Sequence, residues 1–336
     1  MKEFIQKLVE RQDLTRKEAS SAMRCILEGR ATEAQIGAFL VALKLKGEHA
    51  RELLGFVEVM REKSLKVNID DSDAIDLCGT GGDEEGTFNI STVASFVVAG
   101  AGATVAKHGN RAISSACGSA DVLKALGVNI EVTREKVEAC INKIGIGFLF
   151  APLFHPAMKY AAKSRTDLGI KTCFNILGPM TNPGGVGRQL VGTFSQDVAQ
   201  KIASVFSELG TTKACVVYSH DGLDEVSLGA TTVVYEVNGD KSTRSYDVDP
   251  SLFELPLTKK AYLRGGPAET NAVIASNVLR GKKGPHRNTV LANAAFALLI
   301  AGRAESLPEG VHIAAESIDS GSALRKLNEL RDYSSQ

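Results

Sequence analysis

The segment of residues 74–101 constrains the fold more than any other part of the chain. It begins with a short apolar run, Ala74–Cys78, that is typical of a buried strand. The run ends at Gly79, and the glycines of the GTGGD sequence (residues 79–83) permit backbone conformations that a side chain would strain. Asn89–Thr92 then opens an apolar helix that extends to Ala101. A strand, a glycine loop and a helix N-terminus in this order predict an anion site, because free N–H groups and the helix dipole meet there.

The GTGGD loop matches neither common phosphate motif, since both G-x-x-x-x-G-K-[ST] and G-x-G-x-x-G have different spacings. Taken alone, the loop is equally typical of a tight turn between a strand and a helix. Asp83 favours a ligand, because an acid beside an anion site is unfavourable unless it meets a metal ion or sugar hydroxyls. We therefore expect a phosphorylated sugar rather than a bare phosphate.

Composition excludes several classes of protein. The 39 basic and 39 acidic residues give a formal net charge of zero, which argues against a general nucleic-acid or anionic-membrane binder. No apolar run has the length of a membrane span, and the N-terminus has no signal-peptide pattern. The six cysteines are scattered without a C-x-x-C pair, so we expect reduced thiols in the cytoplasm rather than a zinc site or disulfides.

The pattern of apolar residues predicts two domains in an α/β protein. Residues 1–70 read as helices only, with capping boxes at Thr15–Glu18 and Thr32–Gln35, and offer a surface for a dimer. Residues 71–336 alternate strands and helices, which predicts a central, mostly parallel sheet flanked by helices with ligands at the carboxyl ends of its strands. We expect helices around residues 165–185 to join the helical domain.

The individual elements follow from periodicity and from capping residues. The further strands expected are Thr104–Ala106, Val128–Val132, Ile146–Phe150, Leu190–Phe194, Ala214–Tyr218 and Thr232–Val237, and the further helices are Ser119–Leu126, Thr133–Ile144, Asp197–Leu209, Glu269–Leu279, Asn288–Ile300 and Ala323–Tyr333.

A second polar cluster, residues 107–121, follows the expected strand Thr104–Ala106. It combines Lys107, His108 and Arg111 with an amide and several small hydroxyl residues. Either cation alone reads as a solvated surface charge, but the whole block suits a diphosphate held by point charges and backbone N–H groups.

A third cluster, residues 150–160, follows the next strand and suggests an apolar slot for an aromatic ring. Arg165 suits a bidentate pair with a carboxylate. His155 alone reads more often as a structural histidine, and residues 175–183 read as scaffolding behind the slot.

A fourth cluster, residues 219–227, follows the strand Ala214–Tyr218. Its adjacent acids, Asp224 and Glu225, suit Mg²⁺, which prefers carboxylate oxygens together with substrate phosphates. In isolation, two solvated turn acids are an equally simple interpretation.

In this order, the segments GTGGD, KHGNRAISSACGSADVLKALG, FAPLFHPAMK, FNILGPMTNP and GLDEVS resemble the anthranilate phosphoribosyltransferases, a family within the nucleoside phosphorylase/phosphoribosyltransferase fold group. The resemblance extends over nearly the whole chain. It departs from the usual pattern at Ala116-Cys117, where Lys-Ser is common, at Lys171, where arginine is common, and at Met180, where leucine is usual.

The resemblance implies transfer of a phosphoribosyl group from phosphoribosyl diphosphate to the amino group of anthranilate, with release of diphosphate. It also implies two Mg²⁺ ions held with the diphosphate, small-molecule substrates only, a cytoplasmic location and a homodimer formed through the helical domain. A strong general base is optional because the aniline nitrogen is already neutral, and His108 is the candidate if one exists.

The site residues that the resemblance implies fall into three sets. The set for phosphoribosyl diphosphate is Gly79, Gly82, Asp83, Thr87, Asn89, Ile90, Ser91, Thr92, Lys107, His108, Gly109, Asn110, Arg111, Ala112, Ile113, Ser114, Ser115 and Ser119. The anthranilate set is Gly79, Asn110, His155, Tyr160 and Arg165, and the metal set is Ser91, Asp224 and Glu225.

Two alternatives remain open at this point. The same fold group includes pyrimidine nucleoside phosphorylases, which need no metal, and the pair Asp224-Glu225 argues against them. The other alternative is a paralogue without catalysis that binds nucleic acid or a regulator, against which the zero net charge argues.

Overall fold

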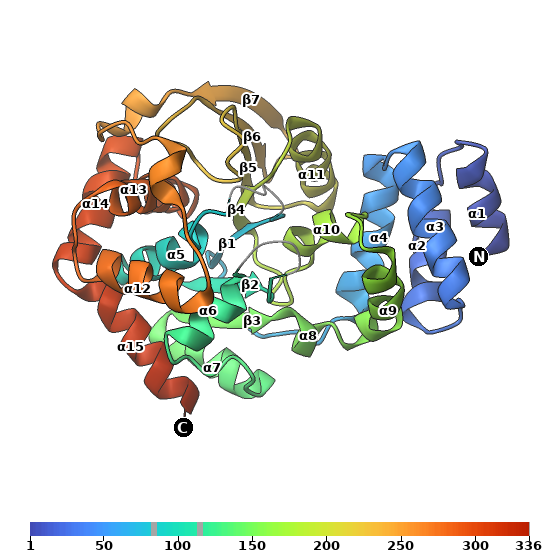
Figure 1. The fold of residues 1–336 in the computed structure, drawn as a ribbon, viewed down its shortest axis with the longest axis horizontal. Helices are drawn as coiled ribbons and strands as arrows, with labels where there is room; N and C mark the ends of the chain where they lie inside the picture. Colours follow the sequence, from blue (N-terminus) through green and yellow to red (C-terminus); the bar gives the residue numbers. More distant parts are fainter. Residues whose placement is uncertain (82–85, 113–116, 336) are drawn as a thin grey trace.

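The computed structural model describes residues 1–81, 86–112 and 117–335. The chain begins with a bundle of helices, drawn in blue at one end of the molecule in Figure 1. Both predicted capping boxes are present, with the Thr15 and Thr32 side chains accepting from the backbone N–H groups of Glu18 and Gln35. The bundle consists of α1 (Lys2–Val9), α2 (Arg16–Leu27), α3 (Glu33–Lys46) and α4 (Ala50–Lys63).

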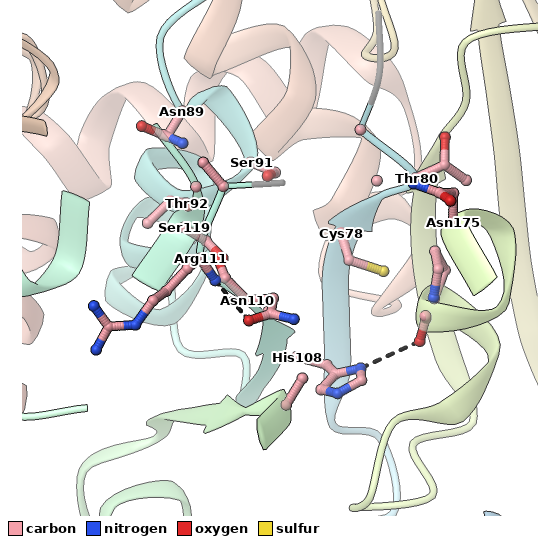
Figure 2. A pocket seen from close by; sticks show the side chains of 18 of the residues that line it. Cys78, Thr80, Asn89, Ser91, Thr92, His108, Asn110, Arg111, Ser119 and Asn175 are labelled. Carbon is pink, nitrogen blue, oxygen red and sulfur yellow. Dashed lines mark hydrogen bonds between the residues drawn. The ribbon is translucent and has the colours of Figure 1, made fainter. Parts of the chain in front are cut away.

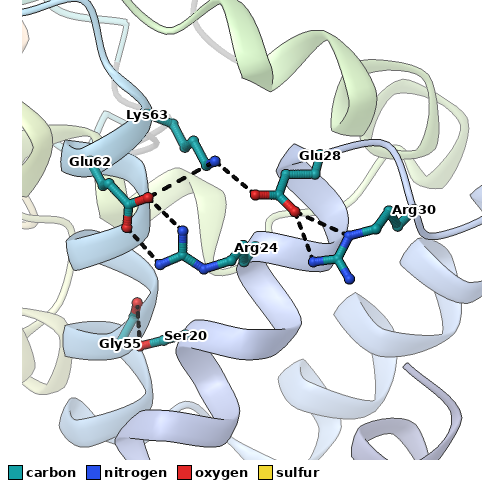
Figure 3. A network of polar contacts seen from close by, with 7 residues as sticks. All are labelled: Ser20, Arg24, Glu28, Arg30, Gly55, Glu62 and Lys63. Atoms are coloured by element: carbon teal, nitrogen blue, oxygen red, sulfur yellow. Dashed lines mark hydrogen bonds and ion pairs between the residues drawn. The ribbon is translucent and has the colours of Figure 1, made fainter.

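Helices α2 and α4 pack closely because a glycine stands where they meet. A Cβ atom on Gly55 would lie 2.5 Å from the carbonyl oxygen of Arg16, so a larger residue does not fit without a shift. Salt bridges close the edge of this contact: Arg24 reaches Glu62, and Lys63 reaches Glu28 at 2.7 Å (Figure 3). The contact between α2 and α4 is therefore close and carries charged pairs at its edge.

The larger part of the chain contains a seven-stranded sheet with the order β3-β2-β1-β4-β5-β6-β7. Every pairing from β3 through β5 is parallel, whereas β5 pairs with β6 and β6 with β7 in antiparallel direction at one edge. This confirms the predicted mostly parallel sheet. The strands are β1 (Ile75–Gly79), β2 (Val105–Gly109), β3 (Ile146–Phe150), β4 (Arg188–Gly192), β5 (Lys213–Ser219), β6 (Thr232–Asn238) and β7 (Thr243–Val248).

Helices cover both faces of this sheet, and each face has its own apolar core. One core surrounds α5 (Ile90–Gly100), which is buried along most of its length against the C-terminal helices (Figure 1). The other core joins the sheet to α11 (Gln196–Leu209) and continues into the helical bundle. The remaining helices are α6 (Ser119–Ala125), α7 (Arg134–Ile144), α8 (Ala151–Phe154), α9 (Lys159–Leu168), α10 (Phe174–Leu177), α12 (Ala268–Leu279), α13 (Pro285–Ile300), α14 (Leu307–Asp319) and α15 (Ser322–Ser335), with short 3₁₀ turns at Pro156–Met158, Gly178–Thr181, Pro250–Phe253 and Lys260–Leu263.

Helices α9 and α10 pack with the N-terminal bundle although they lie far from it in sequence. Ala161 of α9 and Phe174 of α10 are buried in the same apolar core as helices α2–α4. The segment between β3 and β4 therefore crosses from the sheet to the bundle and returns (Figure 1). In the part of the chain that the structure describes, no helix has the length and apolar character needed to cross a bilayer.

The structure differs from the sequence prediction at several elements, of which three bear on the fold. The predicted strand Val128–Val132 does not form, because no strand pairs with it among the described residues; Val128 and Ile130 still bury their side chains, and the backbone N–H of Asn129 donates to Ser334 of α15 at 3.1 Å. Strand β7 and helix α14 were not predicted, since β7 is mostly exposed and α14 carries Pro308 in its first turn and Gly310 close behind, residues that are more typical of a turn.

Candidate active site

The carboxyl ends of β1, β2 and β3 open onto a cavity of about 650 Å³, a volume typical of small-ligand sites. The N-terminus of α5 forms one wall, and Asn175 of α10 lies across the cavity from it (Figure 2). Residues of α9, which packs with the helical bundle, also line the cavity. Most of the predicted site residues line this cavity: Gly79, Thr87, Asn89, Ile90, Ser91, Thr92, Lys107, His108, Gly109, Asn110, Arg111, Ala112, Ser119, His155, Arg165, Asp224 and Glu225.

The wall at α5 combines a helix N-terminus with a buried cation. Lys107 is 4% exposed, and its Nζ donates to the carbonyl oxygen of Leu77 and to Ser91 Oγ at 3.3 Å. Thr92 Oγ1 is buried here and has no hydrogen-bond partner among the described residues. Because the first N–H groups of a helix lack intrahelical partners, this wall favours anions.

Lys107 and His108 belong to β2 itself, whereas the sequence predicted them in the loop after a shorter strand. The carboxylate of Asp76 on β1 accepts from the His108 backbone N–H at 3.1 Å and from Asn182 Nδ2 at 2.8 Å. Complete burial raises the pKa of Asp76 to about 6, and the opposite charge of Lys107 moderates the rise. Burial likewise lowers the pKa of Lys107, and Asp76 opposes that change.

The acid pair lies against the same wall. Glu225 Oε1 accepts from the backbone N–H of Ser91 at 3.1 Å, so the loop after β5 meets the first turn of α5. Asp224 passes over the end of the sheet, where a Cβ atom on Gly192 would lie 1.6 Å from its carbonyl oxygen. A glycine is therefore required on β4 for the acids to reach this position.

This arrangement fits a magnesium ion shared with a ligand. The carboxylates of Asp224 and Glu225 and the hydroxyl of Ser91 are hard oxygen donors. Among the described residues, no three histidine, cysteine or acidic side chains gather into a closed metal site. The acid pair thus suits a cation that takes its remaining oxygens from substrate phosphates and water.

Two buried histidines lie at the floor of the cavity. The rings of His108 and His155 are 5.2 Å apart, and the Nε2 atoms of both are buried without a partner among the described residues. His108 Nδ1 lies 3.2 Å from the carbonyl oxygen of Gly178 (Figure 2), so Nδ1 carries the proton and the lone pair is on Nε2. Burial lowers the pKa of His108 to about 3 and that of His155 to about 4.

Arg165 reaches the cavity from α9. Its guanidinium lies 5.1 Å from the centre of the Phe174 ring, and burial lowers its pKa. An arginine beside an aromatic face suits a ligand that has both a carboxylate and a ring. Tyr160, predicted for the same role, is 44% exposed and does not line the cavity, since its ring lies against Gly29 of the bundle.

Comparison with known proteins identifies the family. Residues 71–324 match the a/b domain of a glycosyl transferase family, and residues 2–64 match the helical bundle domain of the same family. The anthranilate phosphoribosyltransferase of Alkaliphilus metalliredigens is 49% identical over 98% of this chain and 97% of the relative. The chain belongs to the anthranilate phosphoribosyltransferase family.

Further members of the anthranilate phosphoribosyltransferase family agree in sequence and in fold. The relative from Pelotomaculum thermopropionicum is 48% identical over 99% of this chain and 96% of its own length. The crystal structure of the Thermus thermophilus enzyme matches with a TM-score of 0.91 and 37% identity, covering 99% of each chain. The Saccharomyces cerevisiae enzyme in complex with PRPP and Mg matches with a TM-score of 0.89 and 29% identity, covering 99% of this chain and 97% of that one.

The departures from the anthranilate phosphoribosyltransferase pattern lie in three different settings. Cys117 is buried, and its carbonyl oxygen accepts from Asn89 Nδ2 at 3.0 Å. Met180 is fully buried in the core shared with the bundle, and the Lys171 ammonium lies 5.2 Å from the centre of the Phe194 ring. Ala116 lies outside the described residues, as do the predicted site residues Gly82, Asp83, Ile113, Ser114 and Ser115.

Sequence reasoning missed several residues of the cavity. Cys78, Asn175 and Gly178 line it, although the last two were interpreted as scaffolding. Asn293 of α13 holds the acid loop in place, since it donates to the carbonyl oxygen of Val226 and accepts from its N–H, both at 3.0 Å. The only signal for Asn293 was an asparagine within the apolar part of the expected helix, and it does not specify a partner.

Proposed function

We propose that this protein transfers the phosphoribosyl group of 5-phosphoribosyl 1-diphosphate to the amino group of anthranilate, forming N-(5-phosphoribosyl)anthranilate and diphosphate in tryptophan biosynthesis. The observation that carries the proposal is the hydrogen bond between Glu225 and the Ser91 N–H, which joins an acid pair to a helix N-terminus. Arg165 lines the same cavity, and the full-length family relationship agrees with this assignment.

The donor would occupy the α5 wall. We assign its phosphates and ribose to the β1 loop, the first turn of α5 and the residues that follow β2. Backbone N–H groups and the Lys107 and Arg111 cations would stabilise the negative charge that builds on the departing diphosphate. The described residues in this assignment are Gly79, Thr87, Asn89, Ile90, Ser91, Thr92, Lys107, His108, Gly109, Asn110, Arg111, Ala112 and Ser119.

Anthranilate would occupy the side of the cavity toward α9. Arg165 would pair with its carboxylate, with Gly79, Asn110 and His155 near the ring. The lone pair on His108 Nε2 accepts a hydrogen bond from the amino group and orients it, but a pKa of about 3 makes this histidine a weak base. Catalysis then rests on positioning and electrostatic stabilisation rather than on proton abstraction.

We assign magnesium to Ser91, Asp224 and Glu225, with two ions accompanying the diphosphate. When bound, the metal supplies Lewis-acid stabilisation of the leaving group. The yeast relative solved with PRPP and Mg supports this assignment.

We further propose the domain division, assembly and location that the sequence predicted. The helical domain comprises residues 1–70 together with the helices within residues 165–185, and the α/β domain comprises the rest of residues 71–336. The shared core of α9, α10 and the bundle supports this division. We propose a homodimer formed through the helical domain and a cytoplasmic location.

A fluorescence assay tests the function. Loss of anthranilate fluorescence should require both phosphoribosyl diphosphate and Mg²⁺, and excess EDTA should abolish it. The variant carrying Asp224→Asn and Glu225→Gln should lose turnover and yet unfold at the temperature of the native protein in the absence of metal. Retained turnover in EDTA, or phosphorolysis of uridine or thymidine by the native protein, would contradict the proposal.

A further inference from the structure

Two asparagine side chains tie together three loops that line the cavity. Asn89 Nδ2 donates to the carbonyl oxygen of Cys117 at 3.0 Å, and Asn271 Nδ2 donates to Asn89 Oδ1 at 3.0 Å. Asn271 Oδ1 in turn accepts from the backbone N–H of Gly266 at 2.9 Å. Asn89, Cys117 and Gly266 all line the cavity, whereas Asn271 lies behind them on α12 and is 2% exposed.

The two ends of this chain determine the orientation of both amides. Gly266 contributes a backbone N–H, which only donates, so Asn271 must present its oxygen there and its nitrogen toward Asn89. Cys117 contributes a carbonyl oxygen, which only accepts, so Asn89 must present its nitrogen there. The two backbone groups therefore determine, for each amide, which side carries the oxygen and which side carries the nitrogen.

The orientation of Asn89 matters because it stands at the N-terminus of α5. An asparagine in this position usually accepts from its own helix, but the Asn89 side chain makes no such bond. Its amide nitrogen is turned toward the cavity and its oxygen away from it (Figure 2). One N–H of the nitrogen bonds Cys117, which leaves the second as a donor for a ligand.

The loop behind Asn271 holds the arrangement in place. A Cβ atom on Gly265 would lie 2.5 Å from Asn271 Oδ1, so this position requires glycine. The Gly265 N–H donates to the carbonyl oxygen of Gly86 at 2.8 Å, and the Phe88 N–H donates to that of Leu263 at 3.0 Å. The loop that precedes α5 thus lies against the loop that precedes α12.

We propose that Asn271 is a positioning residue for the donor substrate: it accepts from Gly266 and donates to Asn89, and so makes Asn89 present an N–H rather than an oxygen to the phosphoribosyl diphosphate. The inference rests on the proposed function. An oxygen in that direction would face the negative charge of the donor, so reversal of the amide opposes binding of the donor but not of anthranilate.

Substitution of Asn271 by aspartate and by alanine tests the orientation. Asn271→Asp keeps the shape and the acceptor for Gly266, but at pH 8 it places an oxygen against Asn89 Oδ1 and favours reversal of the Asn89 amide. Asn271→Ala only releases that amide. We expect the KM for phosphoribosyl diphosphate to rise about tenfold or more in Asn271→Asp and by a smaller factor in Asn271→Ala, with the KM for anthranilate within about twofold of the native value.

Calorimetric titration with phosphoribosyl diphosphate and Mg²⁺ should reproduce this order without turnover. Asn277→Asp, on the same helix and half-buried, is the matched control and should bind as the native protein does. A larger loss of affinity for phosphoribosyl diphosphate in Asn271→Ala than in Asn271→Asp would show a merely structural role and overturn the inference. Equal rises in KM for both substrates would do the same. If Asn271→Asp does not fold, the inference is tested by Asn271→Ala, in which the KM for phosphoribosyl diphosphate should rise and the KM for anthranilate should not. Inactivity of the native protein would instead reject the proposed function.

Discussion

At the scale of single residues, the site depends on side chains whose charge state is set by burial. Lys107 and Asp76 are both almost fully buried and compensate each other across two strands, which keeps a cation at the donor wall. Burial lowers the pKa of His108 and of His155, and no described carboxylate bonds either ring, so both are neutral at pH 7. The same burial that makes them poor bases leaves their Nε2 atoms available as hydrogen-bond acceptors.

Arg165 should act on one substrate only. Arg165→Ala should raise the KM for anthranilate about ten- to a hundredfold, because a hydrogen bond to a charged group contributes roughly 1.5–3 kcal/mol. Steady-state kinetics with each substrate varied in turn measures the effect. Lys163→Ala, an exposed cation on the same helix, is the control and should leave both KM values unchanged. Equal effects of Arg165→Ala on both substrates would contradict the carboxylate role.

His108 should make the stability of the protein depend on pH. Its pKa is about 3 in the folded state against about 6.5 when unfolded, so below pH 6.5 the unfolded chain binds more protons. The contribution of neutral His108 to the free energy of unfolding is therefore complete above pH 6.5 and is lost as the pH falls toward 3. Between pH 7.5 and pH 5, the free energy of unfolding of the native protein should fall by about 2 kcal/mol more than that of His108→Gln.

Urea unfolding at the two pH values measures this difference. Asp76, whose pKa is raised to about 6, acts in the opposite direction, but it is present in both proteins and cancels. His312→Gln, at an exposed histidine of α14, should retain the pH dependence of the native protein. Identical pH dependence in His108→Gln and the native protein would show that His108 is not held neutral.

At the scale of elements, glycines decide how closely segments approach. Gly55 allows α2 to meet α4, and Gly192 allows the acid loop to cross β4. Sequence reasoning found the helices and the acids from local patterns, but it gave no reason for glycine at either position. That reason is a contact with a segment distant in sequence.

The helix contact predicts opposite effects for two glycines of the bundle. Gly55→Ala should lower the free energy of unfolding by about 1–3 kcal/mol, because the new methyl group meets the Arg16 carbonyl oxygen. Gly37→Ala in α3 should raise it by about 0.5–1 kcal/mol, since nothing lies within 4 Å and alanine favours a helix. Chemical denaturation of both variants checks the pair; a neutral Gly55→Ala would show that α2 and α4 can move apart without loss.

At the scale of the whole molecule, the cavity lies between the sheet and the segment that joins the helical bundle. The wall that we assign to the donor comes from α5, whereas the side that we assign to anthranilate comes from α9 and α10, which share a core with the bundle. A change in how the bundle sits on the sheet would therefore alter the distance between the two substrates. The packing of the bundle against the rest of the molecule therefore helps to set the geometry of the proposed site.

The proposed dimer makes a prediction at this scale. Leu45 of α3 is 72% exposed, as expected of an apolar side chain that a partner covers. Leu45→Glu should shift the sedimentation coefficient from dimer to monomer, because burying a charge in an interface is unfavourable. Leu257→Glu, 75% exposed but remote from the bundle in sequence, should leave the dimer intact. A monomeric native protein would contradict the proposed assembly.

The sequence alone was sufficient for elements whose hydrogen bonds are local. Strand β3 and helix α7 lie where they were predicted, and Thr133 and Gly145 mark the ends of α7 as expected. Such signals work because a cap or a turn satisfies backbone groups within a few residues. The segment Val128–Val132 has the same apolar pattern as a strand, yet no strand pairs with it among the described residues.

Only the tertiary structure decided which of these elements meet. Ser91 and Glu225 are 134 residues apart in sequence, and Asn89 and Asn271 are 182 apart, yet each pair forms a hydrogen bond in or directly behind the wall of the cavity. Tyr160 was predicted to bind anthranilate together with Arg165, but its ring lies against the bundle instead. A residue type states which bonds a side chain can form, whereas the packing of the sheet and helices determines its partner, because burial leaves a polar group only the partners that packing brings to it.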